Sequence, residues 1–288
     1  MILVTGATGT VGTDLVKALT SRGEHVRAMV RDSEKAVSTL GHGVEIVEGD
    51  FGNPETFDAA LRDVDKVFLL SPPSPQTGEQ HGKFVESAKR AGVQHIVRLS
   101  VLPADPNSPI AIGRWHGEAD QHVVDSGIAY TLLRPAYFMQ NQLMSAGTIA
   151  SQGAIYGMLG DGKVGHIDTR DVAEVAAVVL TGEGHEGKVY PLTGPESLSM
   201  TEVAARLSAA LGKEVKYVNV APDQVKAAIM GMGAPEFMAD GLVELYMMIS
   251  QGMADMVVGT FKDITGHDPR GFGQFANDFA SAFEGTSA

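Results

Sequence analysis

The stretch that decides the predicted fold is Thr5-Gly6-Ala7-Thr8-Gly9-Thr10-Val11-Gly12. It follows an apolar run at residues 2–5 and opens a segment of helical period at residues 10–22. Here Gly6 permits a tight turn, Gly9 lets a ligand approach the backbone, and Gly12 lets the helix pack close to the strand. Backbone N–H groups and the helix dipole favour a phosphate at this loop. We therefore predict a dinucleotide-binding turn built from all of residues 6–12.

Short β-branched runs and helical segments alternate from this loop to about residue 134. The strand candidates are residues 2–5, 25–30, 44–47, 66–70, 95–99 and 129–133, and the helix candidates are residues 10–22, 54–61, 79–91 and 112–126. Such alternation is typical of βαβ units with a parallel sheet. The sequence predicts an α/β fold, a Rossmann-type doubly wound parallel sheet with a smaller helix-rich C-terminal substrate region.

The pattern changes after Pro135, where helix candidates at residues 169–180, 201–211 and 222–230 outnumber strand candidates at 188–192 and 214–218. We expect a dinucleotide-binding core over residues 1–135, to which later segments can return, and a smaller substrate-binding or lid region over residues 136–288. Seven of the 13 methionines lie between residues 229 and 256. They indicate either an adaptable surface for flat ligands or a core helix pair.

Composition excludes several classes of protein. The chain has 22 Lys and Arg against 35 Asp and Glu, a net charge of −13, which opposes binding to nucleic acid. It has no cysteine, so disulfides, Cys-ligated metals and cysteine nucleophiles are excluded. His116, Glu118 and Asp120 lack a recognised zinc spacing, and we expect no metal. Without a signal peptide or a long apolar stretch, we expect a soluble, cytoplasmic protein without a membrane partner.

The residue after the second strand candidate bears on cofactor choice. Dinucleotide sites that take NADH place a carboxylate near this point, whereas this chain has Arg31. A guanidinium there can pair with a 2′-phosphate, and Lys35 can add charge, which favours NADPH, with NADH possible. The alternative is a solvated Arg31 that pairs with Asp32 or Glu34.

Further candidates follow the later strands, at the carboxyl edge where open parallel sheets bind ligands. Asp50 can accept a hydrogen bond from the adenine amino group. Each of these positions can also be an ordinary turn. The predicted cofactor-binding residues at these strand ends are Asp50, Phe51, Leu70, Ser71, Pro72 and Pro135.

These motifs, the Gly49-Asp50-Phe51 triplet and the segment from Tyr130 to Asn141, with Leu-Arg-Pro inside it, resemble the NmrA-like branch of atypical short-chain dehydrogenases/reductases. The resemblance covers nearly the whole chain. It is closest to bacterial NAD(P)H-dependent reductases of quinones, azo compounds and triphenylmethane dyes. It implies that the segment from Leu133 to Asn141, which includes Arg134, lines the active-site crevice beside the nicotinamide. The predicted substrate-binding residues are Tyr137, Phe138, Asn141 and Met230.

The chain departs from the wider superfamily at the proton donor. None of its six tyrosines is followed four residues later by lysine, and the corresponding helix carries His116 and Asp120. A ketone would need a positioned acid because hydride addition produces an alkoxide that is about as basic as hydroxide. Hydride addition to a quinone yields a phenolate, whose conjugate acid has a pKa of ~10. Water can protonate this anion after the transfer, so no positioned acid is needed. We therefore expect hydride transfer to a quinone-like or other conjugated aromatic acceptor.

If a protein group donates the proton, His116 is the first candidate, with Asp120 orienting it, and Tyr137 and Ser100 are second. The alternative is that His116 and Asp120 form a structural pair. Two other functions stay open: a non-catalytic regulatory protein that senses NADP(H), and a tailoring reductase of aromatic polyketide biosynthesis. The sequence does not decide between a monomer and a homodimer.

Overall fold

The computed structural model describes residues 1–41 and 43–285. The chain forms two compact units. The core unit contains Met1–Pro135 and Thr169–Pro191, and the second unit contains Ala136–Asp168 and Leu192–Ala288. A later segment thus returns to the N-terminal unit.

The core unit is built on a seven-stranded sheet in the order β10-β6-β5-β4-β1-β2-β3. Strands β1 to β6 pair in parallel, and the strand order reverses between β1 and β4, as in doubly wound sheets. This confirms the predicted α/β fold. The strands are β1 (Ile2–Thr5), β2 (Val26–Val30), β3 (Glu45–Glu48), β4 (Lys66–Leu69), β5 (His95–Leu99), β6 (Ala129–Pro135) and β10 (Lys188–Leu192).

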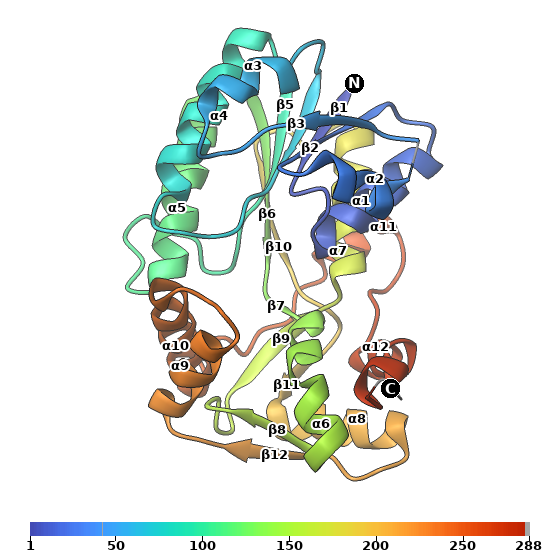
Figure 1. The fold of residues 1–288 in the computed structure, drawn as a ribbon, viewed down its shortest axis with the longest axis vertical. Coiled ribbons are helices and arrows are strands. Elements are labelled where there is room, and N and C mark those ends of the chain that lie inside the picture. Colours follow the sequence, from blue (N-terminus) through green and yellow to red (C-terminus); the bar gives the residue numbers. More distant parts are fainter. Residues whose placement is uncertain (42, 286–288) are drawn as a thin grey trace. The chain divides into compact units, whose positions relative to one another are not determined.

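Helices cover both faces of this sheet. Figure 1 shows α1 and α7 packed together on one face, and α4 and α5 packed together on the other. A 3₁₀ turn, η1, and the short α3 lie where the sequence predicted one helix over residues 54–61. The helices of the core unit are α1 (Thr10–Ser21), α2 (Ser33–Leu40), η1 (Pro54–Thr56), α3 (Phe57–Ala60), α4 (Thr77–Ala91), α5 (Ala111–Asp125) and α7 (Thr169–Thr181).

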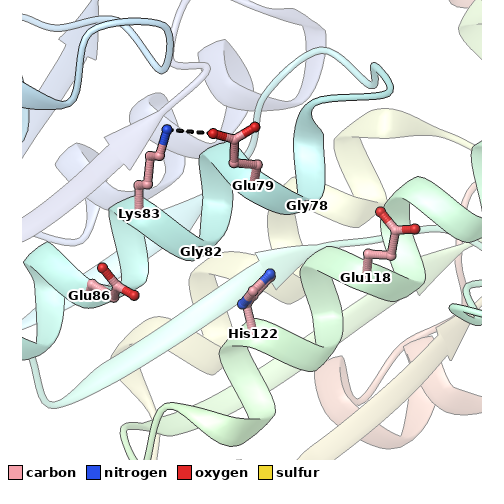
Figure 2. Close-up of a pocket in the computed structure, with 7 residues that line it drawn as sticks. All are labelled: Gly78, Glu79, Gly82, Lys83, Glu86, Glu118 and His122. Carbon is pink, nitrogen blue, oxygen red and sulfur yellow. Dashed lines mark hydrogen bonds and ion pairs between the residues drawn. The ribbon is translucent and has the colours of Figure 1, made fainter.

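Two glycines let α4 approach α5 closely. A Cβ atom on Gly78 would lie 3.0 Å from the Cβ of Glu118, and one on Gly82 would lie 3.0 Å from Cε1 of His122. An open groove of about 390 Å³ runs between the two helices here (Figure 2). The close contact holds α4 and α5, together with the side chains that they carry, against the sheet.

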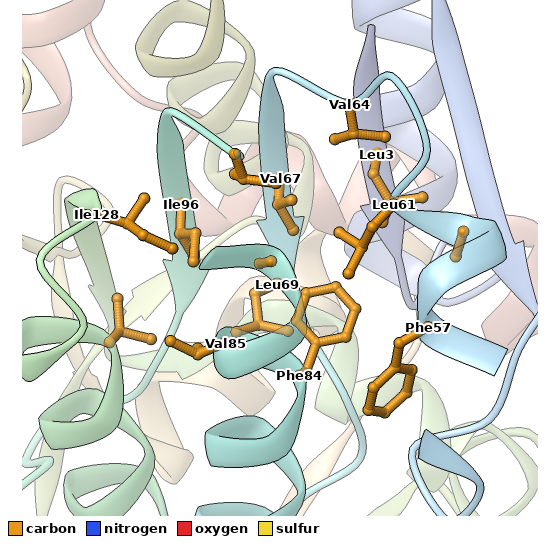
Figure 3. Packing of buried hydrophobic residues seen from close by; sticks show 14 of the residues in the cluster. Leu3, Phe57, Leu61, Val64, Val67, Leu69, Phe84, Val85, Ile96 and Ile128 are labelled. Atoms are coloured by element: carbon orange, nitrogen blue, oxygen red, sulfur yellow. The ribbon is translucent and has the colours of Figure 1, made fainter. Parts of the chain in front are cut away.

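The hydrophobic core on this face joins the sheet to α3, α4 and α5. Phe57 and Phe84 are fully buried, with ring centroids 5.1 Å apart, and pack with Leu3, Leu69 and Ile96 (Figure 3). Burying each of these side chains contributes about 1.5–3 kcal/mol. This packing holds α3 and α4 against strands β1, β4 and β5.

The second unit contains a three-stranded sheet, β11-β9-β7, and a two-stranded pair, β12-β8. Its strands are β7 (Tyr137–Phe138), β8 (Ala154–Gly157), β9 (Lys163–Ile167), β11 (Ser197–Ser199) and β12 (Lys216–Asn219). Its helices are η2 (Met139–Ser145), α6 (Ala146–Gln152), α8 (Met200–Leu211), α9 (Pro222–Gly231), α10 (Glu236–Ser250), α11 (Thr260–Thr265), α12 (Phe272–Asp278) and α13 (Ala280–Phe283).

The methionine-rich segment forms α9, α10 and the chain that follows. Five of its methionines are exposed: Met230, Met232, Met247, Met253 and Met256. The segment is therefore more than a buried helix pair. In the part of the chain that the structure describes, every helix is too short or too polar to cross a bilayer.

Candidate functional site

The glycine loop between β1 and α1 has the close contacts that its sequence predicted. Gly6 has a φ of +62°, a conformation that favours glycine, and a Cβ there would lie 3.0 Å from Cγ of Leu70. A Cβ on Gly12 would lie 2.1 Å from the carbonyl oxygen of Gly6, whereas one on Gly9 would lie 3.2 Å from the same oxygen. Gly12 therefore serves packing, and Gly9 keeps the outer side of the loop open.

The N-terminus of α1 faces outward from this loop. Gly9 is its N-cap and provides no side-chain cap, so the first-turn N–H groups are available to a ligand. Thr8, Gly9 and Thr10 are exposed, whereas Ala7 and Val11 are buried. Exposed backbone donors at a positive helix end fit a pyrophosphate. The loop thus fits the phosphates of a dinucleotide.

Arg31 is exposed directly after β2. Among the described residues it forms no ion pair. Asp32 instead caps α2 by accepting a hydrogen bond from the backbone N–H of Lys35 at 3.0 Å. The exposed side chain of Lys35 lies on the first turn of that helix. Both cations are therefore available to a phosphate near the end of β2.

The turn after β3 is partly occupied by its own contacts. Asp50 Oδ1 accepts a hydrogen bond from the backbone N–H of Gly52 at 2.7 Å. The half-buried ring of Phe51 packs against Phe84 and His81, with centroids 5.5 and 5.2 Å apart. Asp50 thus shapes a turn while it stays exposed, and Phe51 extends the core.

The ends of β4 and β6 hold the remaining predicted cofactor residues. Leu70 donates its backbone N–H to Thr5 Oγ1 at 2.7 Å, which ties this edge to β1. Ser71 is buried beside the exposed Pro72. Pro135 is buried, and its carbonyl oxygen accepts a hydrogen bond from Leu102 N–H at 3.0 Å.

A buried arginine connects β5, α4 and α5. Arg98, on β5, is fully buried and donates from Nε to His81 Nδ1 at 3.1 Å. Its Nη2 lies 3.3 Å from His116 Nδ1, and its Nη1 donates to Asp120 Oδ1. One guanidinium therefore holds two histidines of α4 and α5 and one carboxylate.

The other oxygen of Asp120 is also occupied. Its Oδ2 accepts hydrogen bonds from Ser100 Oγ at 2.9 Å and from Arg134 Nε and Nη2 at 3.1 and 2.8 Å. Asp120 therefore binds two arginines and a serine. The expectation that Asp120 pairs with His116 was wrong, because both of its oxygens are bound by these other groups. The Ser100 proton is held by the carboxylate.

These contacts fix the tautomers of the two histidines. An arginine N–H can only donate, so the Nδ1 atoms of His81 and His116 must accept, and each neutral ring carries its proton on Nε2. Burial, followed by the charge of Arg98, holds the pKa of His81 and of His116 well below the ordinary value. His81 Nε2 then donates to Ser71 Oγ at 2.8 Å.

In the second unit, Tyr137 and Asn141 lie together. The Tyr137 hydroxyl lies beside Tyr246 and Asn141, and burial raises the pKa of Tyr137 well above its ordinary value. Its ring contacts His166 edge-on, with centroids 5.4 Å apart. Phe138 is half-buried on β7, whereas Met230 lies on α9 with 42% of its surface exposed.

Arg98 and Tyr246 were not predicted, whereas Arg134 lies within the segment expected to line the site but had no assigned role. Arg98 interrupts the apolar strand His95–Leu99, and a charged side chain inside a buried strand was the available signal. Tyr246 lies more than a hundred positions from Tyr137, and no local motif joins them.

The groove between α4 and α5 is not lined by any predicted site residue. Its walls carry Glu79, Glu86 and Glu118, together with Lys83 and His122. Within residues 1–41 and 43–285, no three His, Asp or Glu side chains are arranged to hold a metal ion.

The model of the NmrA-like family matches residues 1–257. The NAD(P)H azoreductase of Xenophilus azovorans is 45% identical, over 98% of this chain and 99% of that protein. The crystal structure of the NADPH-dependent quinone oxidoreductase of Escherichia coli, complexed with NADPH, has a TM-score of 0.87 at 33% identity and covers 97% of this chain and 100% of that one.

The triphenylmethane reductase of Citrobacter sp., solved with NADP(H), has a TM-score of 0.83 at 30% identity. That alignment covers 96% of this chain and 99% of the reductase.

Proposed function

The chain belongs to the NmrA-like family, and from this membership and the site geometry we propose that it is an NADPH-dependent reductase of quinones and other conjugated aromatic acceptors. The named relatives support the NAD(P)H-dependent oxidoreductase class. The acceptor class rests on the residues of the core unit. A cytoplasmic location stays a prediction.

The observation that carries the acceptor class is the network around Asp120. Ser100 and His116 lie near the carboxyl ends of β5 and β6, where a reducible group would meet the nicotinamide. The Ser100 proton is bound to Asp120, and His116 is a neutral ring. A site with these groups suits an acceptor that delocalises its new charge.

When bound, NADPH supplies the hydride. Residues 6–12 hold its pyrophosphate, and Arg31 and Lys35 hold the 2′-phosphate. His81 donates to Ser71, whose hydroxyl donates to the Pro72 carbonyl oxygen at 3.4 Å and would turn toward a bound cofactor. Tyr137, Phe138, Asn141 and Met230 are proposed to contact the acceptor. The chain then contributes mainly proximity and orientation.

The test is steady-state loss of the reduced-nicotinamide absorbance, with NADPH and NADH in parallel and a panel of quinones, azo dyes and triarylmethane dyes. We expect acceptor-dependent oxidation that is faster with NADPH. Tight NADPH binding without oxidation by any acceptor would favour a regulatory sensor and contradict the proposal.

The Arg31→Glu variant tests the cofactor assignment in the same assay. A carboxylate beside the 2′-phosphate should weaken NADPH binding at least about 10-fold, with little change for NADH. Arg62→Glu is the matched control because Arg62 is also exposed in the core unit. Equal losses of affinity for NADPH and NADH would show that Arg31 does not bind the 2′-phosphate.

A further inference from the structure

Arg134 carries a positive charge that its neighbours leave unbalanced. Asp120 is the single carboxylate in the network and faces both Arg98 and Arg134. The two histidines that Arg98 contacts are neutral, so the cluster keeps one net positive charge. Arg98 is fully buried, whereas 26% of the Arg134 side chain is exposed. The excess charge is therefore presented by Arg134.

The guanidinium of Arg134 is fixed on one side and open on the other. Nε and Nη2 donate to Asp120, which is itself held by Arg98 and Ser100. In the described part of the chain, Nη1 has no hydrogen-bond acceptor. A guanidinium that a carboxylate holds in place, and whose Nη1 can still donate, is a preorganised hydrogen-bond donor for an oxyanion.

The strand order places this donor away from the phosphate loop. Arg134 lies at the end of β6, and β5 and β4 separate β6 from β1, which carries the loop. Three strand spacings amount to about 14 Å. Arg134 also neighbours Ser100, whose backbone N–H donates to Leu133 at 2.7 Å. This end of the sheet suits the acceptor better than the pyrophosphate.

We propose, on the basis of the function proposed above, that Arg134 binds the oxyanion formed when the acceptor is reduced. Hydride transfer to a neutral quinone breaks the C4–H bond of the reduced nicotinamide and moves one proton and two electrons. The acceptor gains one negative charge, which water later neutralises with a proton. Arg134 stabilises that charge as it forms, and Asp120 and Arg98 are positioning residues.

The choice of acceptor gives an internal control. A cationic triarylmethyl dye accepts the hydride at its central carbon and becomes neutral, so it forms no anion. Arg134→Met should lower kcat/KM for a quinone at least about 10-fold and leave the dye unchanged or faster. Arg134→Lys, which keeps the charge, should be intermediate with the quinone. Arg62→Met should match the wild type with both acceptors.

A binding measurement makes the test independent of turnover. A hydroxynaphthoquinone that is anionic at neutral pH is titrated into the NADP⁺ complex and followed by its own absorbance. Arg134→Met should weaken its binding at least about 10-fold and leave NADPH affinity unchanged. An unchanged affinity, or equal kinetic losses with quinone and dye, would overturn the assignment. A wild type that reduces neither acceptor would instead refute the proposed function.

Discussion

At the residue scale, the three glycines of the first loop have separable roles. A methyl group on Gly12 would meet a backbone oxygen at 2.1 Å, and no side-chain motion can relieve that contact. The corresponding contact at Gly9 is 3.2 Å, which a small shift relieves, and Gly9 is exposed. A substitution at Gly12 should therefore affect folding, whereas one at Gly9 should affect cofactor binding.

We expect Gly12→Ala to destabilise the protein by at least about 1–3 kcal/mol, because overpacking forces the backbone to move. Gly9→Ala should unfold near the wild-type urea midpoint yet bind NADPH at least about 10-fold more weakly. Gly147→Ala, in α6 with nothing near its Cβ, is the control. Equal NADPH affinities in Gly9→Ala and wild type would argue against phosphate binding at this loop.

His116 is the second residue whose role can be measured. Its depressed pKa keeps the ring neutral at physiological pH, and a neutral imidazole is a weak acid. We expect His116→Gln to reduce kcat less than about 10-fold, with the same pH profile as the wild type. A loss of about 100-fold or more, with a lost ionisation, would establish His116 as the proton donor.

The close contacts of the glycine loop could be predicted because its three glycines lie near one another in the sequence, directly after a strand. The Asp120 contacts could not, because helical spacing suggested His116 as its partner, whereas Arg98 and Arg134 come from two other elements. A carboxylate pairs with whichever cations the tertiary structure brings to it, and those lie 22 and 14 positions away.

At the element scale, the parallel strands and their helices were predictable, because β-branched runs ended by glycine leave a clear local signal. Helix α2 was missed because Ala36 is its one buried residue, so its sequence lacks an apolar face. In the second unit, the strand predicted at residues 214–218 overlaps β12, whereas β7, β8, β9 and β11 were not predicted.

The start of α8 provides an element-scale prediction. Ser199 and Glu202 form a capping box, in which each side chain bonds the other residue's backbone N–H. Ser199→Ala should lower the free energy of unfolding by about 1 kcal/mol. Ser151→Ala, at an exposed position of α6, should change it far less. Equal urea midpoints for the two variants would show that the box does not stabilise α8.

At the scale of the whole molecule, buried neutral histidines make the fold sensitive to acid. Burial lowers the pKa of His166 from 6.5 to about 4, and His81 and His116 shift in the same direction. Below about pH 6.5, these histidines bind protons in the unfolded chain but not in the folded chain. This stabilisation is complete above that pH and declines as the pH falls toward the folded pKa.

We expect the urea midpoint to fall as the pH is lowered from about 7 to about 5. Over the full range between its unfolded and folded pKa, His166 alone should contribute about 3 kcal/mol to the free energy of unfolding. His166→Gln should show a shallower pH dependence, because glutamine does not titrate. His25→Gln is the control, since His25 is exposed. Parallel curves for wild type and His166→Gln would contradict this assignment.

We propose that the chain transfers a hydride directly from NADPH to a conjugated acceptor. The most direct measurement mixes the NADPH complex with an equal amount of quinone, without oxygen, and follows a single turnover by absorbance. We predict loss of the reduced nicotinamide with equal formation of hydroquinone, at a lower rate when both C4 hydrogens are deuterium. A bound NADPH that stays reduced beside the quinone would contradict the account and identify a dinucleotide-binding protein without this activity.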